Sequence, residues 1–368
     1  MNTILSSKRF LLLIYGIFFL TACSTNEPII IPSETPQFST QTPTAISSPI
    51  DHTTPTWIPS PNPSPTATPT PKISGDQHVL LMAVGDMMLG RSIGELIQAE
   101  GAIAPYVDTR ETLSTADITI GNLECPISSR GQPEEKTYAF RAPPAAGEAL
   151  ALAGFDLVSL ANNHTLDYGP LALQDTLAAL ASHQIQTVGA GMNTEEAYAP
   201  VVIEIDGLQL AFLAFADIPP TDYDYQSWEA GIDKPGIAWA HPERVREGVS
   251  AAKKEADVVI VLVHNGYEIV QKVSAQQQEI AHLAIDSGAS LVIGSHPHVL
   301  QRIETYQHGI IFYSMGNFVF DNFLFPPNYS AILRAEISPD GVDTYEMIDV
   351  VVQLNGVPQI MPYDFDIP

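Results

Sequence analysis

The chain has 368 residues, of which 45% are hydrophobic and 16% are charged. Its 16 lysines and arginines stand against 42 aspartates and glutamates, which gives a formal net charge of −26 at pH 7. Because proteins contact nucleic-acid phosphates through lysine and arginine, this balance argues against nucleic acid as a partner.

The first 23 residues have the pattern of a secretion signal. Lys8 and Arg9 precede the apolar run 10–20, which is too short to span a bilayer permanently. The run ends in the sequence LTAC at 20–23, which resembles a bacterial lipobox. That resemblance implies that Cys23 carries a lipid, becomes the mature N-terminus and anchors the protein to the membrane without spanning it. The alternative is a buried cysteine in a transmembrane anchor.

Residues 24–75 differ in composition from the rest of the chain. Twelve of the 30 prolines fall here, among threonine and serine and with few charged side chains. Too few apolar groups are present to offset the entropy of ordering, so we expect a disordered, partly polyproline-II tether. At about 3.1 Å per residue such a tether reaches at most about 160 Å. It serves either to carry a domain into the cell wall or as a plain spacer.

Residues 76–368 have the pattern of a folded α/β domain. Cys125 is the one cysteine in this part, so an internal disulfide is excluded and the core must stabilise the fold. The segment is long enough to bury a large core. Helices are expected near 93–100, 145–153, 171–183, 242–254 and 275–286, a hairpin at 201–215 around Asp206-Gly207, and final strands at 331–337 and 345–354. This alternation predicts a layered α/β sandwich.

Six buried strands are each predicted to end on a polar side chain. The runs are 79–86, 118–124, 157–164, 258–264, 291–298 and 310–317, and they end on Asp86, Glu124, Asn163 with His164, His264, His296 with His298, and Asn317. Because the carboxyl ends of parallel strands share one edge of a sheet, these side chains are expected to form one cluster. Imidazole, carboxylate and amide oxygen together suit a first-row metal ion.

Local spacing supports this interpretation in part. In a strand, residues i and i+2 face the same side, so His296 and His298 are both expected to point into the site. Asp86 and Asn163 have an alternative role as caps of the helices that follow them. Met87 and Met88 are expected to pack in the core.

At these residues the chain resembles the CapA family, which is associated with bacterial capsule and poly-γ-glutamate synthesis. The resemblance covers residues 78–321, and residues 322–368 add C-terminal strands. The motifs are GDMMLGR at 85–91, NLE at 122–124, ANNH at 161–164 with DYG at 167–169, HNGYE at 264–268, GSHPHV at 294–299 and YSMGNF at 313–318. The family is in turn similar to calcineurin-like metallophosphoesterases, which implies a four-layer α/β/β/α sandwich around a two-metal centre.

The resemblance also implies roles for individual residues. The implied metal ligands are Asp86, Glu124, Asn163, His264, His296 and His298, which would hold one or two divalent ions such as Mn, Zn, Fe or Mg. His164 would act as the general acid, with Asp167 either orienting it or capping the next helix. Arg91 would receive an anionic substrate or form a surface salt bridge, and Asn317 would bind substrate, support a ligand or complete a turn.

Three positions depart from the metallophosphoesterase pattern. Met88 stands where those enzymes have a ligand histidine, and a thioether is a poor ligand for hard divalent ions. Glu124 replaces an aspartate, and Asn265 replaces a tryptophan. The first two differences are typical of the CapA family.

The sequence therefore favours a lipid-anchored, extracytoplasmic protein that acts in the synthesis of a capsule or poly-γ-glutamate-type polymer through a metal-dependent, hydrolase-like site. Its expected partners are an anionic envelope polymer or a phosphoester, the membrane, and capsule-assembly proteins. Two alternatives are a metal-dependent phosphatase or phosphodiesterase with small substrates and a non-catalytic scaffold that binds the polymer.

Overall fold

The computed structural model describes residues 77–220, 223–321 and 327–361. The predicted signal peptide with Cys23 and the predicted tether at 24–75 lie outside these residues. Among the described helices, none combines the length and the apolar character needed to cross a bilayer.

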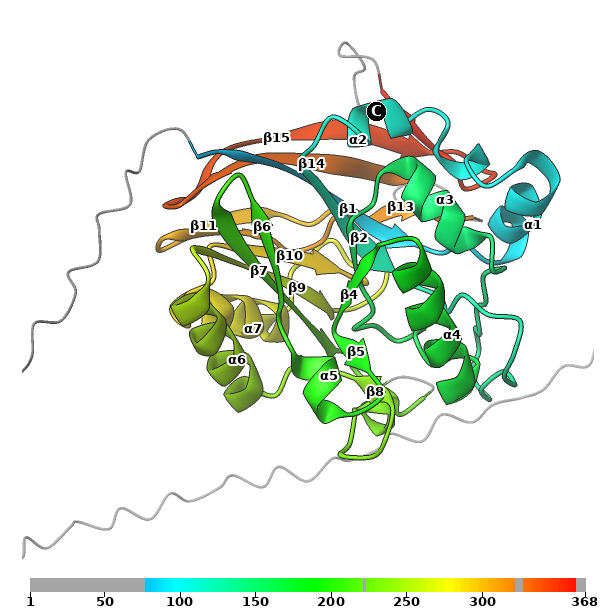
Figure 1. Ribbon diagram of the computed structural model, residues 1–368, viewed down its shortest axis with the longest axis horizontal. Helices are drawn as coiled ribbons and strands as arrows, with labels where there is room; N and C mark the ends of the chain where they lie inside the picture. Colours follow the sequence, from blue (N-terminus) through cyan, green and yellow to red (C-terminus); the bar gives the residue numbers. More distant parts are fainter. Residues whose placement is uncertain (1–76, 221–222, 322–326, 362–368) are drawn as a thin grey trace, which may run out of the picture. The chain divides into compact units, whose positions relative to one another are not determined.

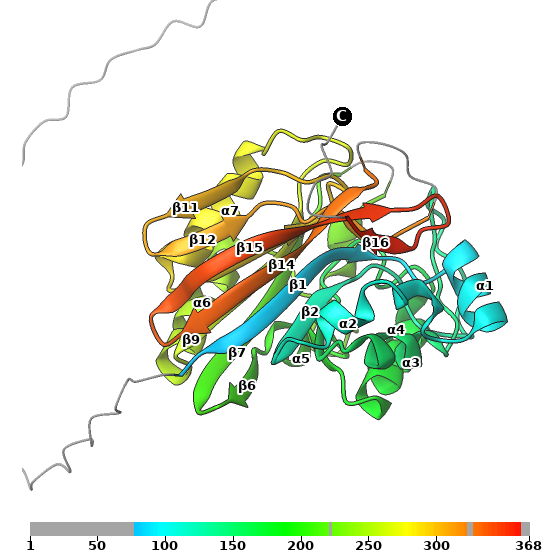
Figure 2. The same ribbon diagram turned by 90° about the horizontal axis from the view of Figure 1, so that it is seen from above.

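The first of two large sheets is mixed and carries the N-terminal strand of the domain near its middle (Figure 2). Four parallel strands, β1 to β4, are continued by three antiparallel strands, β14 to β16, and the short β13 pairs with β1. The bounds are β1 Val79–Met87, β2 Ile118–Leu123, β3 Leu157–Ser159, β4 Gln186–Val188, β13 Asn317–Val319, β14 Tyr329–Ser338, β15 Gly341–Val352 and β16 Pro358–Ile360.

The second large sheet lies under the first in the view of Figure 1. Its four central strands, in the order β12, β10, β9 and β7, are parallel, and antiparallel β11 and β6 form its edges. The bounds are β6 Val201–Ile205, β7 Leu208–Asp217, β9 Val258–Asn265, β10 Leu291–Ser295, β11 Ile303–Tyr306 and β12 Gly309–Phe312. A small third sheet pairs β5 Ala190–Gly191 with β8 Gly236–Ile237.

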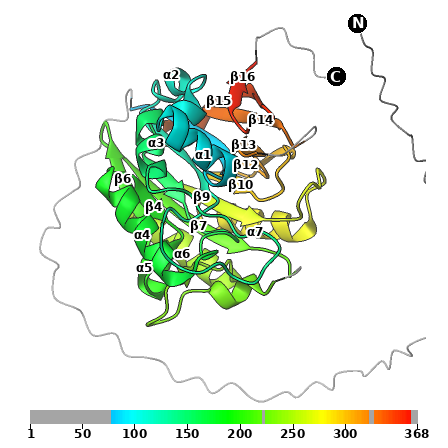
Figure 3. The ribbon, with the colours of Figure 1, turned by 90° about the vertical axis from the view of Figure 1, so that its right-hand side faces the viewer.

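Helices cover the outer sides of both sheets. α1 and α3 lie next to each other beside the first sheet (Figure 3), and α6 and α7 cover the lower side of the second sheet (Figure 1). The bounds are α1 Arg91–Glu100, α2 Arg110–Leu113, α3 Ala146–Ala153, α4 Gly169–Ser182, α5 Thr194–Tyr198, α6 Pro242–Glu255 and α7 Ala275–Asp286, with short 3-10 turns η1 Ala104–Tyr106 and η2 Tyr225–Trp228. The predicted α/β sandwich is confirmed.

Strand periodicity explains why β9, a central strand of the second sheet, is almost entirely apolar. In β9, Ile260 and Leu262 join the core shared with the first sheet, whereas Val259 and Val261 pack in a second core with α6 and α7. Since successive side chains of a strand point to opposite faces, a sheet buried on both faces requires a continuous apolar run. The VVIVLV sequence at 258–263 meets that requirement.

Local sequence also determines the connections. Asp206 and Gly207 both have positive φ, 49° and 80°, as the two central residues of a tight hairpin require. The predicted hairpin is therefore confirmed, between β6 and β7. Ser274 and Gln277 form a reciprocal capping box at the start of α7, which fixes the entry to that helix.

Candidate metal centre

The register of the strands brings polar residues together at one edge of each sheet. Asp86 of β1 pairs with Asn122 of β2 on one side and with Asn317 of β13 on the other. In the second sheet, Ser295 at the end of β10 pairs with His264 of β9. Because the parallel strands of each sheet end on the same side, the two polar edges can meet in one buried cluster.

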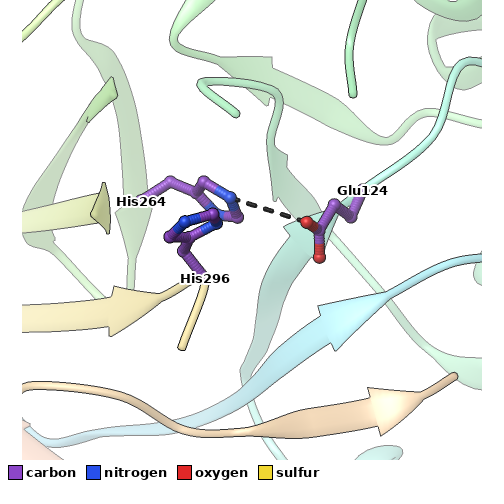
Figure 4. A group of neighbouring side chains, drawn as sticks. All are labelled: Glu124, His264 and His296. Carbon is purple, nitrogen blue, oxygen red and sulfur yellow. Dashed lines mark ion pairs between the residues drawn. The ribbon is translucent and has the colours of Figure 1, made fainter. Parts of the chain in front are cut away.

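The six predicted ligands all lie in this cluster and are all buried. Glu124 follows β2 directly and faces the second sheet, from which His264 and His296 point towards it (Figure 4). Asn163 reaches the site from the loop after β3, since that strand ends at Ser159 rather than at the predicted position.

The expectation that His296 and His298 belong to a strand is wrong. β10 ends at Ser295, and both histidines lie in the following turn with positive φ, 93° and 56°. Such left-handed backbone is uncommon for residues other than glycine. The turn, and not strand alternation, brings both rings into the cluster.

Glu124 is the centre of the cluster. Its Oε1 atom lies 3.6 Å from Nε2 of His264, 3.9 Å from Nε2 of His164 and 4.0 Å from Nε2 of His298. Its two oxygens are buried and form no hydrogen bond, and the same holds for Nδ1 of His296. Buried polar atoms are nearly always paired, because leaving them unpaired costs free energy.

Two overlapping groups of ligand atoms meet around this carboxylate. Glu124, His264 and His296 form one group, and Asp86, Glu124 and His298 form the other. The ligand atoms of each group lie within 4.8 Å of one another. Bonds from Zn²⁺ to nitrogen or oxygen are about 2.0–2.2 Å, so two atoms bound to one ion lie at most about 4.4 Å apart, and the 3.6 Å between Oε1 of Glu124 and Nε2 of His264 is within that limit. The residues therefore fit one or two divalent ions.

Amide side chains hold the ligands in place. Nδ2 of Asn122 donates to Oδ1 of Asp86 at 2.8 Å, and the backbone N–H of His296 donates to Oδ2 of Asp86 at 3.1 Å. Nε2 of His264 lies 2.8 Å from Oδ1 of Asn163, and its Nδ1 lies 2.8 Å from Oγ of Ser295. Asp86 and Asn163 are thus used inside the cluster, and the alternative that they cap helices is wrong, since the caps of α1 and α4 are Gly90 and Tyr168.

Burial controls the protonation of the cluster. It raises the pKa of Glu124 well above the ordinary value, and the Asp86 carboxylate raises it further. Burial lowers the pKa of both His264 and His296 well below the ordinary value, and neighbouring histidines add to that effect. Burial also acts to lower the pKa of His298, but the hydrogen bond and charge of Asp86 raise it overall. Neutral imidazole is the form that binds metal ions.

A second set of contacts holds His164. Its Nδ1 lies 2.6 Å from Oδ2 of Asp167, and Nζ of Lys136 lies 2.7 Å from Oδ1 of the same carboxylate. The ring of Phe140 stacks on His164 with centroids 4.2 Å apart. Asp167 therefore orients His164 and, because Tyr168 is the N-cap residue of α4, does not cap that helix.

The surroundings of His164 favour the neutral ring. Burial lowers its pKa to about 4, with the Asp167 carboxylate raising it and the Lys136 ammonium lowering it. Near pH 7 the ring is therefore neutral, so it must take up a proton before it can act as the general acid that the sequence predicts.

Met88, Arg91 and Asn317 have structural contacts. Met88 is fully buried in the core and its Sδ accepts a hydrogen bond from the N–H of Gly90 at 3.1 Å. Arg91 forms an ion pair with Asp321, and its guanidinium lies 4.6 Å from the centroid of the Phe140 ring. Oδ1 of Asn317 lies 2.8 Å from Nδ1 of His298. Substrate binding by Arg91 and Asn317 stays a prediction.

A cavity of about 500 Å³ opens onto the cluster. Asn163, His164 and His296 line it, and Arg91 is not among its lining residues. A substrate in this cavity would lie against the predicted ligands and the proposed proton donor.

Sequence reasoning missed the residues that support the ligands. Asn122 and Ser295 lie inside the recognised motifs at 122–124 and 294–299. Their positions near Glu124 and His296 in the sequence could therefore have indicated that they support these ligands. Lys136 lies in an irregular loop, and the scarcity of basic residues in the chain was the one signal that could have singled it out.

The fold and the cluster define an α/β-sandwich protein whose buried histidines and carboxylates can hold divalent metal ions. A family model described as "Bacterial capsule synthesis protein PGA_cap" matches residues 80–322. The chain therefore belongs to this bacterial capsule synthesis family.

Curated relatives agree with this assignment. "Capsule biosynthesis protein CapA" of Bacillus anthracis is 31% identical over 76% of this chain and 68% of its own length. "PGA biosynthesis protein CapA" of Bacillus subtilis strain 168 is 31% identical over 73% of this chain and 70% of its own length. A solved structure of a hypothetical protein from Thermus thermophilus has 16% identity and a TM-score of 0.47 over 73% of this chain and 98% of its own, a similarity too low to support an argument about function.

Proposed function

We propose that this chain is a surface-anchored protein of capsule or poly-γ-glutamate-type polymer synthesis and that it acts on the polymer through a divalent metal centre. The relatives' names supply the link to capsule and poly-γ-glutamate synthesis. The metal centre is the part that the chain's own geometry supports.

The observation that carries the metal centre is the state of Glu124. Its side chain is fully buried, both oxygens lack a hydrogen-bond partner, and three imidazole nitrogens lie within 4.0 Å of Oε1. A purely structural buried carboxylate would be paired with hydrogen-bond donors or a permanent positive charge. This arrangement suits a carboxylate whose partner is a metal ion.

The proposed chemistry is hydrolysis of an amide or phosphoester bond in the substrate. A divalent ion at the cluster would polarise the oxygen of the reacting group and offset the charge of an anionic substrate. His164 lines the cavity, so its Nε2 is available to take the proton that the attacking water loses and to pass it to the leaving group, while Asp167 holds Nδ1.

The anchoring part of the proposal depends on Cys23, which lies outside the described residues. A lipidated cysteine would keep the protein in the membrane fraction of the producing cell. Cys23→Ala would then shift the protein out of that fraction. Equal amounts of wild-type and variant protein in the membrane fraction would contradict lipid anchoring.

Metal analysis of the purified protein tests the centre. We expect a stoichiometric divalent metal in the wild type and in the control His308→Ala, because His308 is exposed and outside the cluster. His298→Ala should lose metal. A wild type without metal, and no effect of changing His264 or His298 on stability or binding, would contradict the proposal.

Activity assays on the metal-loaded protein separate the main proposal from its alternatives. Shortening of poly-γ-glutamate that depends on metal supports the main proposal. Turnover of a generic aryl phosphate with Mn²⁺ or Zn²⁺, and none of the polymer, supports a phosphatase. Polymer binding without turnover of either substrate supports a scaffold.

A further inference from the structure

The cavity above the metal centre has walls that suit a particular kind of ligand group. Beyond the predicted site residues, its described lining is mainly aromatic and aliphatic, with Tyr138, Tyr225, Tyr267, Ile218 and Val270. The side chains of Tyr138 and Tyr267 are 60% and 51% exposed. These two tyrosines therefore offer aromatic surface to a ligand that enters from solvent.

Glu268 is the acidic residue among the described lining residues. It lies in the HNGYE motif at 264–268 and is exposed. The pKa of Glu124 is raised first by burial, second by the charge of Asp86 and third by the charge of Glu268. Glu268 lines the same cavity as Asn163, His164 and His296, so a ligand bound at the metal centre would also meet Glu268.

Lys136, which precedes the lining residue Thr137 in the sequence, is already engaged. The Lys136 ammonium lies 2.7 Å from Asp167, and it lies 4.7 Å and 4.9 Å from the ring centroids of Tyr225 and Trp228. Its side chain is 1% exposed. Lysine and arginine do not occur among the described residues that line the cavity, so a polyanion would meet no exposed cationic side chain there.

The charge around the cavity is therefore negative. Glu268 is the one acidic side chain among the described lining residues, and no lysine or arginine among them opposes its charge. Since like charges repel, the part of the cavity beside Glu268 disfavours the middle of a uniformly anionic chain.

We infer that Glu268, with Tyr138 and Tyr267, binds a primary ammonium group of the substrate next to the metal centre. Carboxylates pair with ammonium groups, and aromatic faces attract them. The substrate class is thus a compound with a free amino end beside the reacting bond, such as the amino end of an amide-linked acidic polymer. The inference rests on the proposed function, because the metal centre is what would bind the rest of that end.

The experiment compares two probes on the full-length, Mn²⁺-loaded protein by calorimetry. One probe is a γ-linked glutamate pentamer with a free amino end, and the other is the same pentamer acetylated at that end. We expect the free amine to bind about tenfold more tightly, roughly the difference that 1.4 kcal/mol produces. Glu268→Gln should remove this preference. Glu255→Gln, which removes the same charge at an exposed position on α6, should keep it.

The outcomes distinguish this inference from the proposed function. If the protein holds Mn²⁺ stoichiometrically but binds the acetylated pentamer as tightly as the free amine, the inference is wrong and the metal centre stands. Equal effects of Glu268→Gln and Glu255→Gln would also overturn it, since bulk charge would then explain the result. If the wild-type protein does not bind Mn²⁺, both the proposed function and this inference are wrong.

Discussion

The Nδ1 atom of His298 lies 2.8 Å from the Oδ1 atom of Asn317. The orientation of the Asn317 amide is fixed by its nitrogen, because Nδ2 donates to the carbonyl oxygen of Pro327 at 3.1 Å. Oδ1 can only accept, so Nδ1 of His298 carries a proton and Nε2 is left for a metal ion beside Glu124. Asn317, together with Oδ2 of Asp86 at 3.2 Å from the same Nδ1, thereby sets the tautomer of a predicted ligand, as groups behind metal-bound histidines commonly do.

Asn317→Leu should weaken metal binding about tenfold, because Nδ1 of His298 would lose the nearer of its two acceptors and keep only Oδ2 of Asp86 at 3.2 Å. Titration of the metal-free protein with Zn²⁺ or Mn²⁺ in a calorimeter measures this change. His308→Asn, at an exposed position, serves as the control and should bind as the wild type does. Unchanged affinity in Asn317→Leu would show that the contact has no role in metal binding.

Glu124→Gln should stabilise the metal-free protein near pH 7. The pKa of Glu124 is raised by burial, so its stabilising contribution is full below its ordinary value and is lost as the pH rises through the folded value. An uncharged amide avoids the cost of the buried charge, which is at least about 1 kcal/mol. Thermal unfolding with a chelator present measures the difference.

The same variant should lose its response to metal. Wild-type protein at a metal concentration of 100 times Kd gains about 2.7 kcal/mol of stability. Glu124→Gln should gain little, whereas Glu255→Gln, which is exposed, should behave as the wild type does. A variant that is less stable than the wild type without metal, or equally stabilised by it, would contradict the role of Glu124.

Lys136→Met should destabilise the protein by about 3–5 kcal/mol, because it leaves the Asp167 carboxylate buried and without its ammonium partner. The double variant Lys136→Met with Asp167→Asn should recover part of that loss. Urea unfolding gives the free energies for the full cycle. Lys254→Met, an exposed change on α6, should stay within about 0.5 kcal/mol of the wild type. Additive effects of the two buried changes would show that Lys136 and Asp167 are not coupled.

The sequence predicts the parts of this site that follow strand periodicity. Asp86 and His264 lie in strands, and Glu124 comes directly after one, so buried apolar runs locate all three. The gathering of the two sheet edges follows from parallel strands ending on one side. The α/β sandwich and its helices could be predicted because strand-like and helix-like segments alternate along the chain.

The residues whose placement the sequence does not predict lie in irregular backbone. His296 and His298 enter the cluster through a turn with positive φ, which no periodic pattern encodes. Lys136 lies in a loop between β2 and α3, and its contacts with Asp167 and with the rings of Tyr225 and Trp228 depend on tertiary packing. Loops of this kind follow from the packing of the elements around them, so a single sequence gives no sign of where such a side chain points.

The stability of the metal-free protein should fall as the pH falls from about 7 to about 5. Burial lowers the pKa of His164, His264 and His296 below the ordinary value of 6.5. Between the folded value and 6.5, the unfolded chain binds more protons than the folded one, so this contribution is present above 6.5 and is lost as the pH falls. His298 acts in the opposite direction because its pKa is raised, and its contribution is lost as the pH rises through the folded value.

The three histidines with a lowered pKa outweigh His298, so the free energy of unfolding should fall. We expect a decrease of at least about 1.4 kcal/mol between pH 7 and pH 5. The measurement is urea unfolding at a series of pH values with a chelator present, in the Glu124→Gln background, because the raised pKa of Glu124 would otherwise partly offset the histidines. His308→Asn in the same background should leave the curve unchanged, since that side chain is exposed. A free energy of unfolding that is constant or rises towards pH 5 would mean that the three rings do not stay neutral in the folded protein.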